Sequence, residues 1–233
     1  MQKNFFCFLF FFVLFIILIP PIPSYAESKT IFLTFDDGPG GKVTQQVLDI
    51  LREKNVKATF FLIGEQLKNQ ETLVKQIDSD GHSIGLHSIS HNKSKLYCSN
   101  QSFLNEMLHE QNLLYQITNK KYTIIRFPFG CNNSCYHLTE NLVDLLHQND
   151  FKIYDWNVDT TDGANHTASP ETYIKRAKSD KDTIFLLMHC GFMNKNSPKA
   201  LPEIITYYKE KGYTFKTIDS DTEEIYHYIK KSS

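Results

Sequence analysis

The sequence lacks an excess of charge of either sign, and it lacks the basic stripes that bind nucleic acids. Its 25 lysine and arginine residues nearly balance its 26 aspartate and glutamate residues. No basic run interleaved with aromatic side chains is present, although such a run is the usual footprint of a nucleic-acid-binding surface. The composition therefore argues against nucleic acid as a partner and suits an uncharged or mixed-charge polymer.

Two cofactor-binding patterns are absent as well. No glycine-rich dinucleotide fingerprint follows the first predicted strand. The cysteines beyond the N-terminal segment do not form a close-spaced zinc pattern, because only Cys131 and Cys135 are near each other. These two are close enough to bridge a loop, but cysteines without a chemical role are the favoured interpretation.

A long hydrophobic run opens the chain, and residues 1–26 are not expected to belong to the folded domain. Lys3 gives a basic start, apolar residues fill 5–19, and small residues precede a cleavage position after Ala26. This arrangement is typical of a secretory signal peptide. An uncleaved anchor is the alternative, although about 15 apolar residues is short for a span of roughly 20. In either case we expect 27–233 to be an extracellular or cell-surface monomer that meets a membrane only through its N-terminal segment.

Predicted strands and helices alternate about seven times beyond that segment, and no linker or repeat divides them. Such alternation is typical of a parallel α/β sheet. An open doubly wound sheet and a closed barrel share the signature. Unusual polar residues fall where strands end, which favours a barrel with its site at the carboxyl ends of the strands. Residues 221–230 are predicted as a last helix.

Two adjacent carboxylates mark the end of the first predicted strand. Asp36 and Asp37 follow the apolar run 30–33 and precede the glycine- and proline-rich turn 38–41. Neighbouring like charges repel, so the pair is costly unless a metal ion or an arginine compensates one of them. A turn with capping aspartates is the plain interpretation of the pair alone. Histidine, arginine and aspartate residues at later strand ends favour a functional site.

Two histidines four residues apart lie in a second polar segment. If 87–91 turns as a helix, His87 and His91 face the same way and both rings can bind one ion. A polar loop without chemistry is the alternative. Together with Asp37 they would form a His₂Asp set with room for water and substrate, the open pattern of catalytic zinc. We predict a divalent metal, zinc first, with cobalt, nickel or manganese also acceptable to these ligands.

Three further segments place polar residues at predicted strand ends. Arg126 ends one strand, where its planar guanidinium can pair with a carboxylate, and the following turn makes the amide of Phe129 a candidate oxyanion donor. A strand predicted over 151–158 leads into a loop with Asp159. His189 ends a strongly apolar strand, and Asp159 is expected to orient it or keep it protonated. A surface arginine and a packed core histidine are the plain alternatives.

The five segments, in this order, resemble the polysaccharide deacetylase family, the NodB-homology domain of carbohydrate esterase family 4. The two most specific segments are Thr34-Phe35-Asp36-Asp37-Gly38-Pro39 and His87-Ser88-Ile89-Ser90-His91. The other three are 126–130, 155–163 and 187–189, which fall in register. The resemblance spans 30–218 and implies a distorted (β/α) barrel of seven or eight strands, the NodB type.

By position, the resemblance implies roles for the acidic and histidine residues. Asp36 matches the general base that activates the hydrolytic water, and Arg126 matches the residue that holds this base. The implied metal ligands are Asp37, His87 and His91.

The resemblance also assigns residues to the leaving group and the acetyl group. His189 matches the general acid that protonates the departing amine, and Asp159 matches the acid that tunes it. Phe129 stands where a backbone amide helps to stabilise the oxyanion. Leu187 matches the apolar wall for the acetyl methyl.

One position departs from the family pattern. The fourth segment of the family usually ends in Asp-Trp, and this tryptophan lines the acetyl pocket, whereas here Gly163 follows Asp162. Trp156, the only tryptophan of the chain, is a candidate replacement from the neighbouring strand. A core position for Trp156 is the alternative.

The resemblance implies a secreted, metal-dependent hydrolase that removes N-acetyl groups from amino-sugar polymers. The predicted export of the chain favours peptidoglycan as the substrate, with N-acetylglucosamine ahead of N-acetylmuramic acid. Chitooligosaccharides, poly-N-acetylglucosamine and acetylated xylan are alternative substrates. A non-catalytic glycan-binding module is a different class, which the complete set of acidic, histidine and arginine residues argues against. A metal-dependent phosphodiesterase is another, and the sequence shows no phosphate clamp beyond Arg126 to support it.

Overall fold

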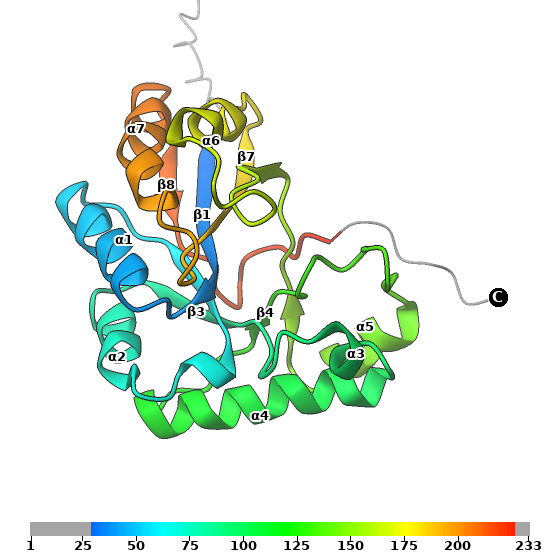
Figure 1. Ribbon diagram of the computed structural model, residues 1–233. Coiled ribbons are helices and arrows are strands. Elements are labelled where there is room, and N and C mark those ends of the chain that lie inside the picture. The colour runs from blue at the N-terminus through cyan, green and yellow to red at the C-terminus, as the bar shows by residue number, and fades with distance from the viewer. Residues whose placement is uncertain (1–28, 227–233) are drawn as a thin grey trace, which may run out of the picture.

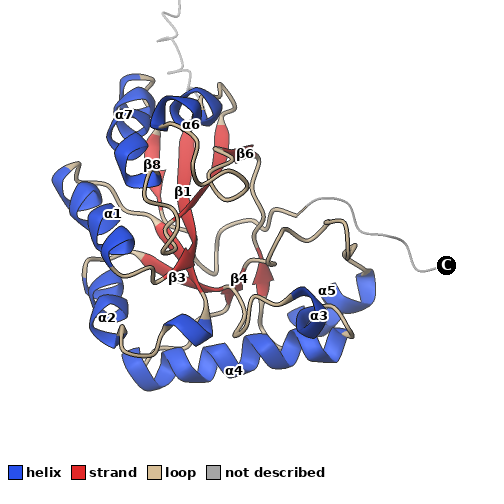
Figure 2. Ribbon diagram, in the orientation of Figure 1, coloured by secondary structure: helices blue, strands red, loops and turns tan. Residues whose placement is uncertain are grey.

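Parallel strands of one curled sheet form the centre of the protein (Figures 1 and 2). The computed structural model describes residues 29–226. Its strands are β1 (Thr30–Gly38), β2 (Thr59–Leu62), β3 (Ser83–Leu86), β4 (Ile124–Ile125), β5 (Lys152–Ile153), β6 (Val158–Asp159), β7 (Thr183–His189) and β8 (Thr214–Lys216). They follow the order β5-β4-β3-β2-β1-β7-β6, and β8 also pairs with β1. The predicted distorted α/β barrel of parallel strands is confirmed, as a curled half-barrel.

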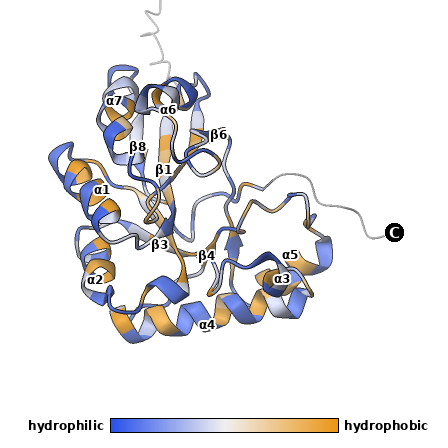
Figure 3. Ribbon diagram, viewed as in Figure 1, coloured by the Kyte–Doolittle hydropathy of each residue, from blue (hydrophilic) through white to orange (hydrophobic). Residues whose placement is uncertain are grey.

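Helices surround the strands on the outside of the curl (Figures 1 and 2). They are α1 (Lys42–Glu53), the 3₁₀ turn η1 (Gly64–Gln66), α2 (Glu71–Ser79), α3 (Lys93–Leu96), α4 (Asn100–Thr118), α5 (Glu140–His147), α6 (Pro170–Ala177) and α7 (Ser197–Glu210). Each longer helix carries both hydrophobic and hydrophilic residues (Figure 3). In α1 the buried residues Val43, Val47 and Leu51 recur at helical spacing, so one face of the helix packs on the sheet.

Strand alternation divides the core into an outer and an inner layer. Ile31, Leu33 and Phe35 of β1 belong to the large cluster that also includes helix residues. Phe32 belongs to a smaller cluster without helix residues and stacks on Phe185 of β7 at 4.5 Å between ring centroids. Because successive side chains of a strand point to opposite faces, this smaller cluster fills the inside of the curl. Even-numbered residues of β1 therefore point inward.

The strand predicted over 151–158 is instead two short strands at opposite edges of the sheet. β5 pairs with β4, and β6 pairs with β7. The residues between them cross from one edge to the other. The buried guanidinium of Arg126 donates hydrogen bonds to the carbonyl oxygens of Tyr154 (2.8 Å) and Asp155 (2.9 Å) in this crossing segment. Because these carbonyl oxygens accept hydrogen bonds from a side chain and not from a neighbouring strand, the strand predicted over 151–158 is interrupted here.

The same arginine joins the crossing segment to β1. Arg126 Nη1 donates to Asp36 Oδ1 at 2.8 Å and to Thr34 Oγ1 at 2.6 Å. Arg126 is fully buried and Asp36 is 3% exposed. An ion pair of this kind lies in a low-dielectric interior, where removing one partner leaves a costly buried charge.

Two predictions concern the ends of the chain. The predicted signal peptide or anchor over 1–26 lies outside the described residues. Within 221–226, the described part of the predicted last helix, the chain is not helical, and Ile225 forms a bridge with Tyr154. Residues 29–226 contain no helix that is both long and apolar enough to cross a membrane.

Replacing Arg126 by methionine should lower the free energy of unfolding by about 3–5 kcal/mol, because Asp36 is then buried without its cation. Chemical denaturation of the purified protein measures this loss. Arg52→Met is the matched control, since Arg52 pairs with Asp80 at 2.7 Å with 55% of its side chain exposed. A solvent-exposed pair of this kind contributes little to stability. Equal losses in the two variants would contradict the interior role of Arg126.

Candidate functional site

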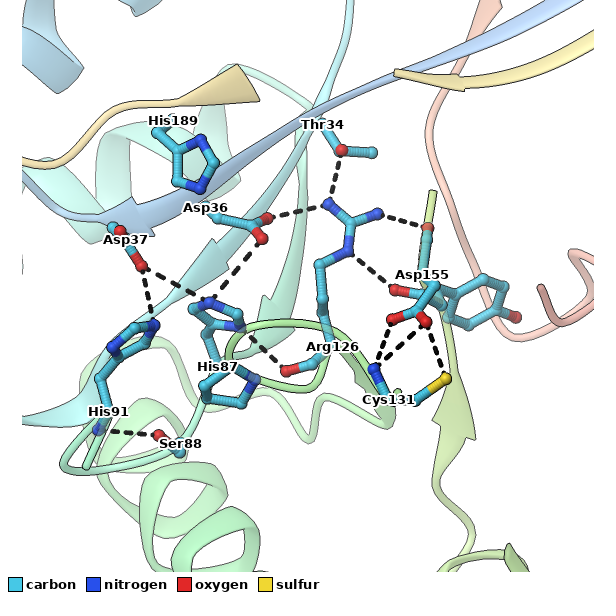
Figure 4. Close-up of polar contacts among 12 residues, drawn as sticks. Thr34, Asp36, Asp37, His87, Ser88, His91, Arg126, Cys131, Asp155 and His189 are labelled. Atoms are coloured by element: carbon cyan, nitrogen blue, oxygen red, sulfur yellow. Dashed lines mark hydrogen bonds and ion pairs between the residues drawn. The ribbon is translucent and has the colours of Figure 1, made fainter. Parts of the chain in front are cut away.

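The adjacent carboxylates of Asp36 and Asp37 reach the same place because β1 is irregular where it ends. The β1–β2 register shifts between Phe35 and Gly38, which marks a bulge. Asp37 has a φ of 63°, in the left-handed region that non-glycine residues rarely adopt. In a regular strand the two side chains would point to opposite faces. Here both approach His87, whose Nε2 lies 3.7 Å from Asp36 Oδ2 and 3.5 Å from Asp37 Oδ1 (Figure 4).

Asp37, His87 and His91 bring three ligand atoms together (Figure 4). Asp37 Oδ1 lies 3.3 Å from His91 Nε2, and one ligand atom of each residue falls within 4.8 Å of the others. Asp37 Oδ1 is buried and has no hydrogen-bond partner among the described residues. A buried carboxylate oxygen without a partner is costly unless a cation compensates it. The site therefore fits a divalent cation.

Asp37 and His91 have the protonation states that a metal requires, and a hydrogen bond orients the ring of His87. Burial raises the pKa of Asp37, but the neighbouring imidazoles outweigh this and hold it well below its usual range. Burial and the adjacent His87 lower the pKa of His91 to about 4, so its ring is neutral at pH 7. His87 Nδ1 lies 2.9 Å from the carbonyl oxygen of Arg126. A carbonyl only accepts, so Nδ1 carries the proton and Nε2 is left free to bind a metal.

Residues 87–91 are a loop and not the helical turn that would align the two histidines from their spacing. Ser88 and His91 have positive φ values of 73° and 49°, which a helix does not allow. Ser88 Oγ accepts a hydrogen bond from the backbone N–H of His91 at 3.0 Å. The loop geometry, and not helical periodicity, brings His87 and His91 together.

Helix α4 supports this loop through an acidic residue that sequence reasoning missed. Glu106 accepts hydrogen bonds from the backbone N–H of Ser90 (2.8 Å) and from Ser90 Oγ (3.0 Å). Glu110, one turn further along α4, is fully buried, and burial raises its pKa well above the usual range. The sequence feature that could have indicated these residues is the spacing of two acidic residues four positions apart on the buried side of an amphipathic helix.

The histidine at the end of β7 has a different partner from the one predicted. His189 Nδ1 lies 2.8 Å from Asp162 Oδ1, and Asp162 Oδ2 accepts hydrogen bonds from the backbone N–H of His189 and from Ser197 Oγ. Asp159 instead accepts from the backbone N–H of Thr161 at 2.6 Å. The expected pairing of Asp159 with His189 is therefore corrected to Asp162, because the loop after β6 turns before the later carboxylate reaches the ring.

The environment of His189 favours its protonated form. Burial lowers the pKa of His189, but the hydrogen bond and charge of Asp162 outweigh burial and raise the pKa to about 9. His189 is also the register partner of Asp36 across the β1–β7 ladder. A protonated imidazole thus lies beside the carboxylate pair, which places an acid and a base in one site.

Gly163, the departure from the family pattern, packs against the ring of His189. A Cβ atom on Gly163 would lie 2.5 Å from His189 Nε2, closer than any side chain permits. The glycine is therefore required by a close approach. A larger residue here would displace the histidine.

The remaining predicted residues lie around this centre. Phe129 has a φ of 66°, and its ring lies 4.6 Å from the ring of His91 between centroids. Leu187 is buried in β7 opposite Thr34. The indole of Trp156 lies over the Arg126 guanidinium and packs on the inner cluster.

The described residues 29–226 contain four cysteines, and no disulfide joins any two of them. Cys98 and Cys135 are exposed, whereas Cys131 and Cys190 are buried. The Cys131 thiol donates to Asp155 Oδ2 at 2.7 Å. The predicted bridge between Cys131 and Cys135 is therefore not formed, and the favoured interpretation, cysteines without a chemical role, stays a prediction.

Known proteins share both the sequence and this architecture. The sequence model described as polysaccharide deacetylase matches residues 24–138. A peptidoglycan-N-acetylglucosamine deacetylase of Bacillus cereus is 36% identical over 204 residues, which cover 84% of this chain and 71% of that protein. The crystal structure of a polysaccharide deacetylase from Bacillus cereus is 35% identical with a TM-score of 0.75, covering 84% of this chain and 94% of the other.

A second solved structure agrees. The catalytic domain of a peptidoglycan N-acetylglucosamine deacetylase from Eubacterium rectale is 30% identical with a TM-score of 0.79, covering 87% of this chain and 94% of that domain. The curled half-barrel is therefore the NodB type that the sequence predicted.

In the metal-free protein, His189 should titrate near pH 9, remaining protonated below that value and losing its proton as the pH rises through it. Two-dimensional NMR of the histidine ring nitrogens measures this pKa. Asp162→Asn removes the charge that outweighs burial, so the pKa should fall to about 6.5 or below. Asp159→Asn is the matched control and should leave it near 9. If the pKa of His189 fell only in the Asp159 variant, the result would support the predicted pairing of Asp159 with His189.

Glu106→Gln and Ser90→Ala should each weaken zinc binding by about tenfold, because outer contacts position the ligand loop. Competition with a chromophoric chelator measures the zinc affinity. The variant His87→Ala serves as the reference for the loss of affinity when one proposed ligand is removed. Glu203→Gln, on the exposed face of α7, is the control. Unchanged affinity in both loop variants, with normal thermal unfolding, would show that α4 does not position the loop.

Proposed function

The chain belongs to the polysaccharide deacetylase family, and from this premise we propose that it removes acetyl groups from N-acetylglucosamine residues of peptidoglycan outside the cytoplasm. One observation carries the proposal: the ligand cluster of Asp37, His87 and His91 lies beside a carboxylate held by Arg126 and a histidine held by Asp162. Hydrolysis of an acetamide needs a base, an acid and a means to stabilise negative charge. The site supplies each of these.

The ligand cluster is proposed to hold a divalent cation, zinc first. When bound, such an ion polarises a carbonyl oxygen and lowers the pKa of water toward 7. Asp37, His87 and His91 leave other coordination positions open for water and substrate, as catalytic zinc sites do.

Asp36 is proposed as the general base. Its Oδ1 is fixed by Arg126, and its Oδ2 faces the ligand cluster near His87 Nε2. The ion pair with Arg126 sets the orientation of the carboxylate, so that Oδ2 can accept a proton from the attacking water. Attack on the acetamide carbon then yields a negatively charged oxygen.

His189 is proposed as the general acid, and Phe129 as the oxyanion donor. The protonated ring of His189 can give its Nε2 proton to the departing amine while Asp162 holds Nδ1. The positive φ of Phe129 turns the backbone sharply beside His91, and no acceptor for its N–H is found within 29–226. Leu187 and Trp156 stay as proposed contacts to the substrate.

The choice of substrate rests on the relatives that carry peptidoglycan in their names and on the export signal proposed for residues 1–26. Cleavage after Ala26 or retention as an anchor would both leave 27–233 as the catalytic domain at the cell surface. Chitooligosaccharides, poly-N-acetylglucosamine and acetylated xylan are the competing substrates. A glycan-binding module without catalysis would not need a protonated histidine beside a carboxylate held by a buried arginine.

Asp36→Asn should lower acetate release by about 10²–10⁴-fold, the usual contribution of a general base, while zinc binding stays within a few-fold of normal. The assay compares purified peptidoglycan, N-acetylglucosamine oligomers and acetylated xylan, with and without chelator. Asp159→Asn is the matched control, and its rate should stay within about tenfold of the unmodified protein, since Asp159 contacts neither Asp36 nor the ring of His189.

Chelator-sensitive release that is fastest from peptidoglycan supports the proposal. Faster release from neutral oligomers or xylan would reassign the substrate. A zinc-loaded protein that releases no acetate from any of the three would favour the binding-module alternative.

A further inference from the structure

A groove with a volume of about 850 Å³ lies between α1 and the start of α7. Its apolar lining residues are Val43, Ile50, Phe192 and Pro198. Phe192 also lines the smaller pocket of about 370 Å³ that contains Asp37 and His91. Phe192 therefore lines both the groove and the pocket at the ligand cluster, so the two cavities are neighbours.

The groove has a positive rim in a chain that is otherwise close to neutral. Lys42, Lys195 and Lys199 line it, and Asp49 is its only carboxylate. Asp49 is already paired with Arg52 at 3.3 Å. Among residues 29–226, no carboxylate lies within ion-pair distance of these three lysines. The rim therefore offers ammonium groups that the protein itself does not neutralise.

Helix stability does not account for two of these lysines. Lys42 is the first residue of α1, and Lys199 lies in the first turn of α7. The amino-terminal turn of a helix favours acidic side chains and disfavours basic ones, yet neither first turn contains an acidic residue. Both lysines lie where the helix dipole disfavours a positive charge, and both line the groove.

We propose that this groove binds the carboxylate-bearing peptide attached to the glycan strand, while the sugar to be deacetylated lies over the ligand cluster. This inference rests on the proposed function and deepens it. The apolar floor suits aliphatic peptide groups, and Lys42 and Lys195 pair with peptide carboxylates. The groove is too large for a single carboxylate, so a peptide and not a lone acidic sugar substituent is its occupant.

A neutral N-acetylglucosamine homopolymer has no group for these lysines. The groove thus discriminates between peptidoglycan and chitin-like substrates without contacting the acetyl group. Phe192, which lines both pockets, is 53% exposed and can contact a bound ligand.

The test compares the double variant Lys42→Gln/Lys195→Gln with the control Lys75→Gln/Lys175→Gln, which removes the same charge from exposed positions on α2 and α6. Substrates are soluble glycan fragments with intact peptides, the same fragments after amidase removal of the peptides, and N-acetylglucosamine oligomers of equal length. The groove variant should raise KM about fivefold for the peptide-bearing fragments only, as expected for two solvated ion pairs. Raising the salt concentration should shrink this difference.

An equal KM increase on all three substrates, or the same increase in the control variant, would overturn the proposal. If the groove variant also raises KM for the amidase-treated fragments, the groove would bind the carboxylate of the acidic sugar and not the peptide. Calorimetric binding of peptide-bearing fragments separates this inference from the proposed function. If the fragments bind in a lysine-dependent way but no acetate is released, the groove proposal is supported and the proposed activity is contradicted. If acetate is released but binding does not depend on the lysines, the proposed activity is supported and the groove proposal is contradicted.

Discussion

The buried cation of Arg126 is the interaction on which the geometry of the site depends. Its guanidinium compensates Asp36 and donates to the carbonyl oxygens of the segment that crosses between the sheet edges. Its own carbonyl oxygen fixes the tautomer of His87. A planar group with five donors can make all these contacts at once, which a lysine ammonium cannot. Arg126 thus holds the segment that crosses between the sheet edges, orients the carboxylate proposed as the base, and fixes the tautomer of His87, a proposed metal ligand.

Four of the nine non-glycine residues with positive φ among residues 29–226 lie at the candidate site. Asp37, Ser88, His91 and Phe129 all have positive φ values, although none is a glycine. Conformations of this kind persist only where the surrounding structure over-determines them, and they cluster at functional sites. Here the surrounding structure is the parallel sheet on one side and Glu106 of α4 on the other. The regular, hydrogen-bonded parts of the strands stabilise the fold and so hold the strained residues at the strand ends in place.

Two histidines of the same site are held in opposite protonation states. Burial and a neighbouring imidazole keep His91 neutral, whereas Asp162 keeps His189 protonated. Separated pKa values are what allow one site to contain both a ligand and an acid at neutral pH. The lysines that line the groove have no ion-pair partner among residues 29–226, so their positive charges are available to a ligand.

The sequence by itself determined the alternation of strands and helices and the residue types at the strand ends, because apolar periodicity and short motifs are local properties. It thereby identified Asp36, Asp37, His87, His91, Arg126 and His189, which the structure brings together. Only the tertiary structure decided that Asp162 and not Asp159 reaches His189, that 87–91 is a loop, and that 151–158 divides. These outcomes depend on how a turn is shaped by partners far along the chain: Arg126 for the divided strand, Ser197 for Asp162, and Glu106 for the ligand loop. No local pattern records such partners.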